Sequence, residues 1–234
     1  MKILITGNLG YVGSVLTKHL KHNFSNLEII GFDRAFFSHI ISEDIISPEL
    51  FVDIQYINDV RSFPESLLRG IDAVIHLAAI SNDPMGNEFS EVTNDVNFLS
   101  TIDIATKAKR MGVSKFIFAS SCSVYGFASE LPKTEKDEVN PLSTYAKSKI
   151  DAERDLLELA DENFTITCLR FATACGYSPR LRLDLVLNDF VASALSSGKI
   201  NILSDGSPWR PLIDVNDIDE NFYKIYIHYK IHRI

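Results

Sequence analysis

Hydrophobic residues along this chain follow two alternating patterns. Short continuous apolar runs predict buried strands of a parallel sheet, and apolar residues spaced three and four apart predict helices between them. The predicted strands are 3–5, 27–32, 50–54, 73–77, 115–119 and 164–169, and the predicted helices are about 12–20, 94–111 and 144–161. Because strands that alternate with helices are typical of a doubly wound α/β fold, residues 1–170 are predicted to form one such domain.

The pattern changes after about residue 170. Turn-forming glycine, serine and proline residues bracket one further helical stretch, which is predicted at about 184–197. Residues 171–234 are therefore predicted to form a small second lobe over the carboxyl edge of the sheet. Open α/β sheets bind their ligands at that edge.

Three glycines follow the first strand at intervals of three: Gly7, Gly10 and Gly13. Gly7 and Gly10 allow a tight turn and a close approach of the backbone to a pyrophosphate, and Gly13 allows the next helix to pack against the strand. The N–H groups at the start of that helix favour an anion. A dinucleotide is the predicted ligand, and the alternative is an ordinary turn that has this spacing by chance.

An acidic residue, Asp33, ends the second strand twenty positions after Gly13. A carboxylate at this place binds the adenosine ribose hydroxyls in Rossmann domains, and it repels a ribose 2′-phosphate. The predicted cofactor is therefore NAD rather than NADP, although the neighbouring Arg34 offers a cation that suits such a phosphate. The alternative interpretation of Asp33 is an ordinary surface carboxylate.

Composition narrows the classes of partner and compartment. The chain has 234 residues, of which 46% are hydrophobic, and a formal charge of −8, with a pI near 5.2 and a mean hydropathy of +0.05. This acidic balance argues against a nucleic-acid-binding surface. The three cysteines lack metal-ligand spacing, so reduced thiols and no metal site are predicted. Without a membrane-length apolar run or a signal-peptide region, the protein is expected in the cytoplasm, away from membranes.

A tyrosine and a lysine four residues apart, Tyr145 and Lys149, lie at the start of the predicted helix 144–161 and share one of its faces. A nearby ammonium is expected to lower the pKa of the phenol, which suits acid–base chemistry on an alcohol carbon. Hydroxyls at the end of the preceding strand, Ser120 and Ser121, are placed to hydrogen-bond the same oxygen. Each feature alone is more often an exposed pair or a polar strand end, so only their conjunction favours catalysis.

Together these motifs resemble the extended branch of the short-chain dehydrogenase/reductases, which contains nucleotide-sugar epimerases and dehydratases. The resemblance runs from Lys2 to about Ile218, and within it His76 is interpreted as a packed strand-end side chain. Its further motifs are Asp59-Val60, His76-Leu77-Ala78-Ala79, Val96-Asn97, Val124-Tyr125-Gly126 and Trp209-Arg210-Pro211. The resemblance implies a Rossmann domain that binds NAD and a lobe that binds a nucleotide sugar.

The resemblance also implies a role for each matching residue. Tyr145 is the implied catalytic base, Lys149 binds the nicotinamide ribose, and Ser121 hydrogen-bonds the reacting oxygen of the substrate. Asn188 and Arg210 are implied to hold the substrate diphosphate, which suits the donor fork of arginine. The implied cofactor contacts are Gly7, Gly10, Tyr11, Val12, Gly13, Asp33, Arg34, Asp59, Val60, Leu77, Ala78, Ala79, Asn97 and Lys149, of which Asn97 also supports the active-site structure.

The chain departs from the family pattern in three places. Cys122 and Ser123 stand where dehydratases carry an acidic pair, so elimination of water is not expected. Asp214 stands three residues after Pro211, in place of a usual histidine, and adds negative charge near the implied diphosphate site. The chain ends at Ile234, before the elements that complete the family's substrate lobe, so 171–234 is interpreted as a partial, truncated lobe.

The leading hypothesis is an NAD-dependent nucleotide-sugar epimerase. A dehydrogenase or ketoreductase of the same family is one alternative, and a truncated NAD-binding protein without catalysis is another. The resemblance also implies a homodimer through the helices 94–111 and 144–161. The apolar contacts expected there are Ile102, Ile104, Ala105 and Ala108.

Overall fold

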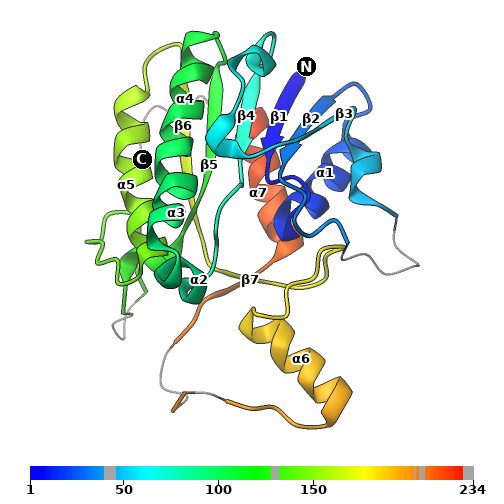
Figure 1. Cartoon of the computed structure of the whole chain (residues 1–234), viewed down its shortest axis with the longest axis vertical. Helices are drawn as coiled ribbons and strands as arrows, with labels where there is room; N and C mark the ends of the chain where they lie inside the picture. The colour runs from blue at the N-terminus through cyan, green and yellow to red at the C-terminus, as the bar shows by residue number, and fades with distance from the viewer. Residues whose placement is uncertain (40–45, 128–131, 203, 206–208, 229–234) are drawn as a thin grey trace.

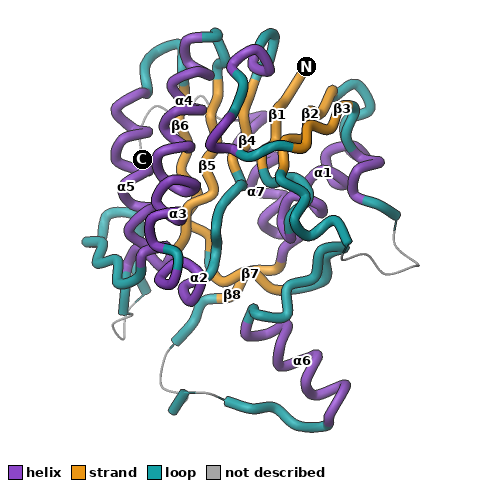
Figure 2. The backbone as a smooth tube through the Cα atoms, viewed as in Figure 1, coloured by secondary structure: helices purple, strands orange, loops and turns teal. Residues whose placement is uncertain are grey.

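The structure is a computed structural model that describes residues 1–39, 46–127, 132–202, 204–205 and 209–228. Within these residues, six parallel strands form the main sheet in the order β3-β2-β1-β4-β5-β6 (Figures 1 and 2). The strands are β1 (Lys2–Thr6), β2 (Glu28–Asp33), β3 (Ile54–Ile57), β4 (Ala73–His76), β5 (Lys115–Ser121) and β6 (Thr165–Phe171). This order confirms the predicted doubly wound fold, in which the chain changes direction between β1 and β4.

Helices cover both faces of the sheet (Figure 1). One face carries α3 (Ser90–Asn94), α4 (Ser100–Arg110) and α5 (Thr144–Leu159), and the other carries α1 (Tyr11–Asn23) and α7 (Val215–His228). A short helix, α2 (Asp83–Glu88), leads from the β4 edge toward α3. No helix in the described part of the chain combines the length and the apolarity that crossing a membrane requires.

Successive strand residues point to opposite faces, so the sheet has two hydrophobic cores. Leu4 faces α4 and α5, where Leu156 is fully buried, and Ile3 and Ile5 face α1 and α7. A sheet covered on both faces needs apolar side chains on both, which explains the continuous apolar runs of the sequence.

The residues expected at a dimer interface lie in or against the hydrophobic core of this chain. Ile104, Ala105 and Ala108 have no exposed surface and belong to the core between α4 and the sheet, and Ile102 packs against that core. A short amphipathic helix has one apolar stripe, and in α4 this stripe packs against the sheet. The expectation that Ile104, Ala105 and Ala108 contact a second subunit is therefore wrong, whereas the contact of the partly exposed Ile102 and the homodimer itself stay predictions.

Two predicted elements differ from those observed. The strand predicted at 50–54 is partly a 3-10 turn, Pro48–Phe51, and β3 begins only at Ile54. Proline suits the first position of a helical turn because it lacks an N–H donor. The helix predicted at 94–111 is divided by a π-helical turn, Asp95–Leu99, which carries the buried side chain of Asn97.

The region predicted as one lobe, 171–234, is divided between two places. Two short strands, β7 (Thr173–Cys175) and β8 (Leu212–Asp214), form a separate parallel pair, from which α6 (Val186–Ser197) extends away from the main sheet (Figures 1 and 2). The helix α7, which was not predicted, returns to the main sheet and packs beside α1. The predicted turn residues 206–208 and the last residues, 229–234, lie outside the described residues.

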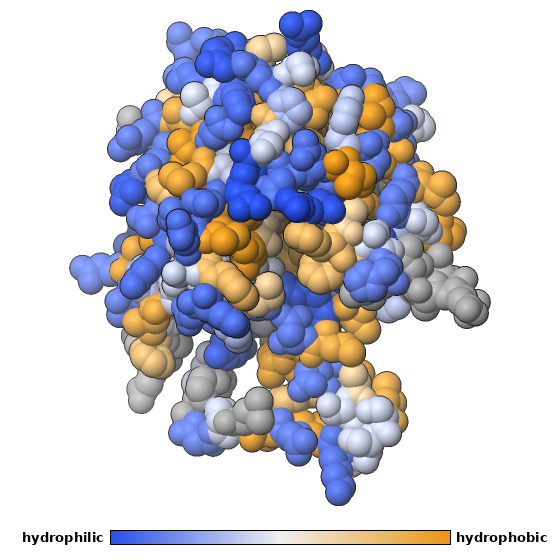
Figure 3. Space-filling model, in the orientation of Figure 1, coloured by the Kyte–Doolittle hydropathy of each residue, from blue (hydrophilic) through white to orange (hydrophobic). Residues whose placement is uncertain are grey.

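The part of the chain that carries α6 exposes hydrophobic side chains, some of which are visible in Figure 3. On α6 these are Leu187, Val191 and Leu195. Among the described helices and strands, β7 is the main element that packs against this helix, and it does so through few residues. The α6 segment therefore depends less on the two cores than α7 does.

A carboxylate, Asp219, is buried on the α7 side of the sheet. Its side chain has no exposed surface, and among the described residues neither of its oxygens has a hydrogen-bond partner. Burial, with a smaller contribution from the charge of Asp214, raises the pKa of Asp219 to about 8. The folded protein therefore favours the neutral carboxylic acid at this position.

We expect Asp219→Ala to be more stable than the wild type at pH 8, with a free energy of unfolding about 1–3 kcal/mol higher. The reason is that the substitution removes a buried carboxyl group without hydrogen-bond partners among the described residues. The folded state holds a proton that the unfolded chain releases above its ordinary pKa of 3.8, so wild-type stability falls as pH rises toward about 8. Urea denaturation at about pH 5 and pH 8 measures this difference. Glu220→Ala, at an exposed acidic position of α7, is the control, and an equal gain at both pH values would contradict the raised pKa.

Candidate active site

The glycine-rich turn lies at the carboxyl end of β1, where it touches the segment after β4. Gly7 has φ +73°, and a Cβ there would lie 2.7 Å from the Ala78 backbone nitrogen. A Cβ on Gly13 would collide with the Gly7 carbonyl oxygen. Gly10 precedes α1 without a capping side chain, and the first turn of the helix has no acidic residue. Gly7 and Gly13 thus leave no room for side chains, and the uncapped helix N-terminus stays available to an anion, as a dinucleotide requires.

At the end of β2, the Asp33 carboxylate stands next to this turn. It accepts hydrogen bonds from the backbone N–H groups of Ala35 (2.7 Å) and Leu9 (3.1 Å). Burial raises the pKa of Asp33, which these hydrogen bonds partly oppose. A carboxylate can accept about four hydrogen bonds, more than the backbone donors supply at Asp33, so the group fits the ribose hydroxyls of a dinucleotide.

A segment from the second lobe packs behind the glycine-rich turn. The Tyr11 hydroxyl donates to the Gly176 carbonyl (2.7 Å), and the Ser178 hydroxyl donates to the Tyr11 carbonyl (2.7 Å). The Arg180 guanidinium is buried, donates to the Leu9 carbonyl (3.2 Å), and counteracts the rise in the Asp33 pKa. Tyr11 was predicted as a cofactor contact, and the structure shows its hydroxyl joining α1 to the second lobe.

The loop after β4 connects the glycine-rich turn with α5. Thr6 Oγ1 accepts a hydrogen bond from the Ala78 N–H, which holds the start of the Leu77–Ala79 segment beside the turn. The Asn97 amide is bonded to both backbone groups of Ile80 (2.8 and 2.9 Å) and donates to the Ser148 hydroxyl of α5 (3.2 Å). Asn97 therefore positions two predicted cofactor segments relative to each other, which agrees with the structural role that the resemblance implies.

The interpretation of His76 as a packed side chain is confirmed. The ring is buried, with its two nitrogens at 2.8 Å from the Thr6 hydroxyl and 3.0 Å from the Thr101 hydroxyl. Burial, with a smaller effect of the Lys149 charge, lowers the pKa of His76 to about 3. A neutral imidazole enclosed in this way serves packing rather than proton transfer.

Three candidate catalytic residues meet where β5 and α5 come together. Ser121, the last residue of β5, hydrogen-bonds the side chain of Tyr145, the second residue of α5. One turn later on α5, the Lys149 ammonium lies 5.7 Å from the centre of the Tyr145 ring and donates to the Ala119 carbonyl (2.7 Å). The conjunction predicted for Ser121, Tyr145 and Lys149 is thus a spatial cluster at the carboxyl edge of the sheet.

The electrostatics of Tyr145 differ from the sequence-based expectation. Burial raises the pKa of Tyr145, whereas the hydrogen bond from Ser121 and the charge of Arg182 act to lower it. Lys149 is only 2% exposed, and burial lowers its own pKa to about 7. The predicted lowering of the Tyr145 pKa by Lys149 is therefore wrong for this structure, because burial disfavours the charged forms of both groups.

An ion pair between a buried glutamate and a partly buried arginine lies beside this cluster. Glu153, one turn after Lys149, accepts two hydrogen bonds from Arg170 of β6, with Nη2 at 2.6 Å and Nε at 3.0 Å, and also bonds the Ser120 hydroxyl. The remaining nitrogen of the Arg170 guanidinium, Nη1, donates to the Tyr125 hydroxyl (2.9 Å). This network ties α5 to the ends of β5 and β6.

The second lobe contributes a cation near Tyr145. Arg182 forms a two-point ion pair with Asp184 (2.6 and 3.0 Å) and donates to the Ser81 hydroxyl (2.7 Å) in the loop after β4. Sequence reasoning missed Arg182, as it missed Arg170, Arg180 and Glu153. No local motif marks these residues. Glu153 alone had a usable signal, because its spacing of four from Lys149 places both on one helix face.

The two predicted diphosphate contacts have different surroundings. Asn188 is buried, its oxygen accepts from the Gly176 N–H (3.0 Å), and its amide donates to the Arg182 carbonyl (3.0 Å) and the Tyr11 hydroxyl (3.3 Å). The structure thus engages Asn188 in holding α6 to the glycine-rich region. Arg210 is exposed, and its positive charge acts to lower the pKa of the Cys122 thiol.

Asp214 and the predicted adenine contacts also have defined partners. Asp214 accepts from the Asn216 N–H (2.9 Å) and lies against Gly176, at the start of α7. Arg34, considered as a partner for a 2′-phosphate, forms an ion pair with Asp59, and Val60 is buried behind it.

Comparison with known proteins agrees with this arrangement. Residues 3–231 match the family model described as the NAD dependent epimerase/dehydratase family. The chain is 27% identical to a UDP-glucose 4-epimerase of Mycolicibacterium smegmatis over 237 residues, which cover 96% of this chain and 72% of that protein. It is 28% identical to a dTDP-D-glucose 4,6-dehydratase of Dictyostelium discoideum over 236 residues, which cover 94% of this chain and 54% of that protein.

A solved structure shares the fold closely. The UDP-glucuronic acid 4-epimerase from Bacillus cereus, in complex with UDP-glucuronic acid and NAD, superposes with a TM-score of 0.86 at 27% identity. The match covers 99% of this chain and 74% of that one. The similarity therefore includes the main sheet and the described part of the second lobe.

The ion pair of Glu153 and Arg170 is expected to contribute to the stability of the folded protein. We expect Glu153→Gln to lower the free energy of unfolding by about 1.5–3 kcal/mol, because the partly buried Arg170 guanidinium loses the carboxylate that accepts its hydrogen bonds. The double variant Glu153→Met/Arg170→Met is expected to lose less, since it removes both charges. Urea denaturation measures both, with Glu65→Gln, which breaks the exposed pair with Arg110, as the control of little effect. A Glu153→Gln variant as stable as that control would contradict this role.

Proposed function

Because the chain belongs to the NAD-dependent epimerase/dehydratase family, we propose that it is an NAD-dependent epimerase of nucleotide sugars. The observation that carries this proposal is the hydrogen-bonded pair of Ser121 and Tyr145, with Lys149 buried beside it, at the ligand-binding edge of a Rossmann sheet. Neither a purely structural role nor simple cofactor binding requires these three side chains together.

The residues at the carboxyl edge of β1 and β2 fit the cofactor. The glycine-rich turn and the N-terminus of α1 suit a pyrophosphate, and Asp33 suits the adenosine ribose. The Leu77–Ala79 segment and Lys149 are proposed to line the nicotinamide half. When bound, NAD supplies an acceptor and donor of hydride for a carbon of the sugar.

Tyr145 is proposed to take and return the proton of the sugar hydroxyl through its phenolic oxygen. Ser121 holds the same oxygen and stabilises the phenolate, since its hydrogen bond lowers the Tyr145 pKa against the effect of burial. Lys149 is kept buried by the Ala119 carbonyl and by the aromatic face of Phe118, 4.5 Å away. These contacts hold the acid–base group in position before any substrate binds. Such pre-orientation lowers the entropic cost of reaching the transition state.

The surroundings of Ser121 favour epimerisation over dehydration. Cys122 and Ser123 follow it, and the Ser123 N–H and hydroxyl both donate to the Ser121 oxygen (3.2 and 2.9 Å). Burial raises the pKa of the Cys122 thiol, so that it stays protonated near neutral pH. Cys122 and Ser123 therefore do not supply the second acid–base pair that elimination of water requires beside Tyr145. Retention of the oxidised sugar gives epimerisation, and its release gives net dehydrogenation.

The proposed substrate class is a nucleoside diphosphate sugar, with a UDP-sugar tested first because two of the similar proteins act on or bind one. Arg210 is the proposed contact of the diphosphate, since its guanidinium is exposed and carries the donor fork that phosphate requires. Asn188 is proposed to act by holding the lobe beside the turn.

Replacement of Tyr145 by phenylalanine tests the chemistry. We expect Tyr145→Phe to retain NAD binding within about twofold and to lose turnover by about 10²–10⁴-fold, because the proton acceptor is removed. Product analysis by chromatography with UDP-glucose, UDP-glucuronic acid and UDP-N-acetylglucosamine measures turnover, and calorimetry measures NAD binding. Tyr56→Phe, on the edge strand β3, is the control.

Wild-type turnover in Tyr145→Phe would refute the catalytic role of the tyrosine. A wild-type protein that binds NAD but neither converts nor is thermally stabilised by any of these sugars would instead support a binding protein without catalysis.

The Ser121 hydrogen bond predicts a change in pH dependence. Because the phenolate is the active form, kcat/KM is expected to rise with pH, and the raised Tyr145 pKa extends the rise above neutral pH. Ser121→Ala removes a group that lowers this pKa, so the rising limb is expected to move to higher pH. Rates measured between about pH 6 and pH 10 locate the limb. A limb that stays in place or moves to lower pH would be inconsistent with the assigned role.

A further inference from the structure

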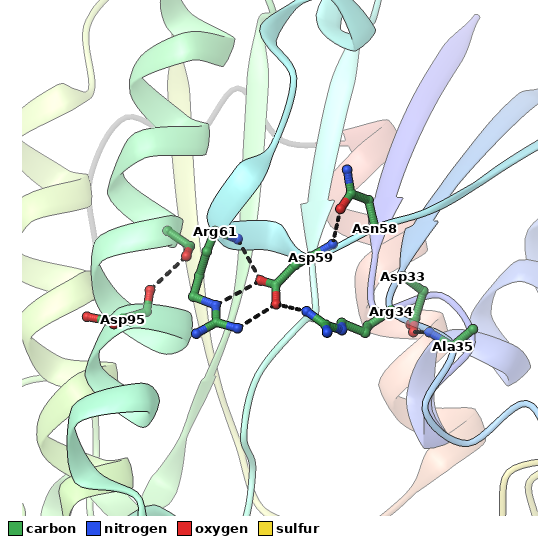
Figure 4. Close-up of polar contacts among 8 residues, drawn as sticks. Asp33, Arg34, Ala35, Asn58, Asp59, Arg61 and Asp95 are labelled. Carbon is green, nitrogen blue, oxygen red and sulfur yellow. Dashed lines mark hydrogen bonds and ion pairs between the residues drawn. The ribbon is translucent and has the colours of Figure 1, made fainter.

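A compact ionic cluster occupies the carboxyl ends of β2 and β3, beside the proposed ribose site (Figure 4). The register of the sheet pairs Asp33 with Ile57, and the Asn58 N–H continues the pairing by donating to the Asp33 carbonyl (3.0 Å). Arg34, which follows β2, and Asp59, which lies two residues after β3, are therefore neighbours. Figure 4 shows Arg34 and Arg61 approaching the Asp59 carboxylate from opposite sides.

Both oxygens of the Asp59 carboxylate are engaged by these arginines. Arg61 binds in a two-point arrangement, with Nε at 3.0 Å from Oδ1 and Nη2 at 2.7 Å from Oδ2, and its backbone N–H donates to Oδ1 (2.9 Å). Arg34 donates through Nη1 to Oδ2. The hydrogen bonds from Arg61, followed by those from Arg34, hold the pKa of Asp59 well below its usual range. The carboxylate is thus charged at any working pH.

Two arginines around one carboxylate have the geometry of an anion-binding subsite, and here the bound anion is the Asp59 side chain. Phosphate and carboxylate present similar oxygen pairs to a guanidinium fork. The Asp59 side chain is 14% exposed, whereas those of Arg34 and Arg61 are 48% and 41% exposed. A ligand can therefore reach the two arginines from solvent, but their donors already face an internal anion.

The place of the cluster connects it with cofactor choice. An arginine just after β2 is the group that accommodates the ribose 2′-phosphate of NADP in Rossmann domains, where an acidic residue selects NAD. This chain has both, Asp33 and Arg34, so the identity of the strand-end residue does not settle the preference. The other charged groups that act on the members of this cluster are the carboxylate of Asp95, beside Arg61, and the guanidinium of Arg180, beside Asp33.

We propose that Asp59 is a specificity determinant that masks an anion subsite formed by Arg34 and Arg61, and thereby makes the site select NAD over NADP. The inference rests on the proposed function in assuming that the dinucleotide binds at this edge. It goes further because it assigns the selectivity to a residue that follows β3, in addition to the acidic residue of β2. Removal of the Asp59 charge leaves two guanidinium groups able to meet a phosphate.

The test compares the affinities for the two cofactors. In Asp59→Asn, the side-chain oxygen can still accept from the Arg61 N–H, so the local turn is retained while the negative charge is lost. We expect the ratio of the NADP dissociation constant to the NAD dissociation constant to fall by about 10–100-fold, the effect of one to two charge-assisted hydrogen bonds. Calorimetric titration with NAD and with NADP measures the ratio without any need for turnover.

Two further variants serve as controls for this change. Glu65→Gln makes the same change in net charge and releases another arginine, Arg110, which ends α4 just before β5 begins and hence at the opposite edge of the parallel sheet. Its cofactor ratio is expected to equal that of the wild type. Adding Arg34→Ala to Asp59→Asn is expected to reverse most of the gain in NADP affinity.

The outcomes separate this proposal from the proposed function. An unchanged ratio in Asp59→Asn, or an equal gain in Glu65→Gln, overturns the masking role even if NAD binds well. Should Asp59→Asn not fold, Arg34→Ala in the wild-type background decides: a tenfold loss of NADP affinity relative to NAD would show that Arg34 was available to the phosphate, contrary to the proposal. Failure of the wild type to bind either dinucleotide would overturn the proposed function itself.

Discussion

The close contact between the glycine-rich turn and the segment after β4 is the constraint on which the candidate site depends. Gly7 lies so near Ala78 that a side chain at position 7 would force the two segments apart. That segment is linked through Asn97 to Ser148, and hence to the start of α5. The spacing between the proposed cofactor edge and Tyr145 is therefore set by backbone contacts and one buried amide, without reliance on flexible surface side chains.

Buried charge is handled in different ways on the two faces of the sheet. On the α5 face, Glu153 meets Arg170, and Lys149 meets a carbonyl and an aromatic ring, so each buried ionic group has a partner. On the α7 face, Asp219 has none among the described residues. Partners offset the cost of removing a charge from water, and a group without one becomes neutral instead. The face that carries the proposed chemistry is thus also the one whose ionic groups are structurally supported.

Local sequence patterns predicted the parts of the site that depend on one strand end or one helix face. The turn of Gly7, Gly10 and Gly13 requires a backbone without side chains, and Tyr145 and Lys149 require only helical spacing, so both were visible in the chain. The partners of these groups were not. Arg180 and Arg182 lie far along the chain from the turn and the helix that they approach, and no spacing rule connects them.

The sequence by itself determined the doubly wound sheet, the location of the glycine-rich turn and the spacing of Tyr145 and Lys149, because each follows from periodicity or from residue types at short spacing, and the family resemblance added Ser121 to complete the cluster. Only the tertiary structure decided the protonation of that cluster, since burial raises the Tyr145 pKa and lowers that of Lys149. It also decided that Arg34 faces Asp59 and that α7 covers the main sheet. Desolvation and long-range pairing depend on which segments the fold brings together, and that information is not local to any stretch of the chain.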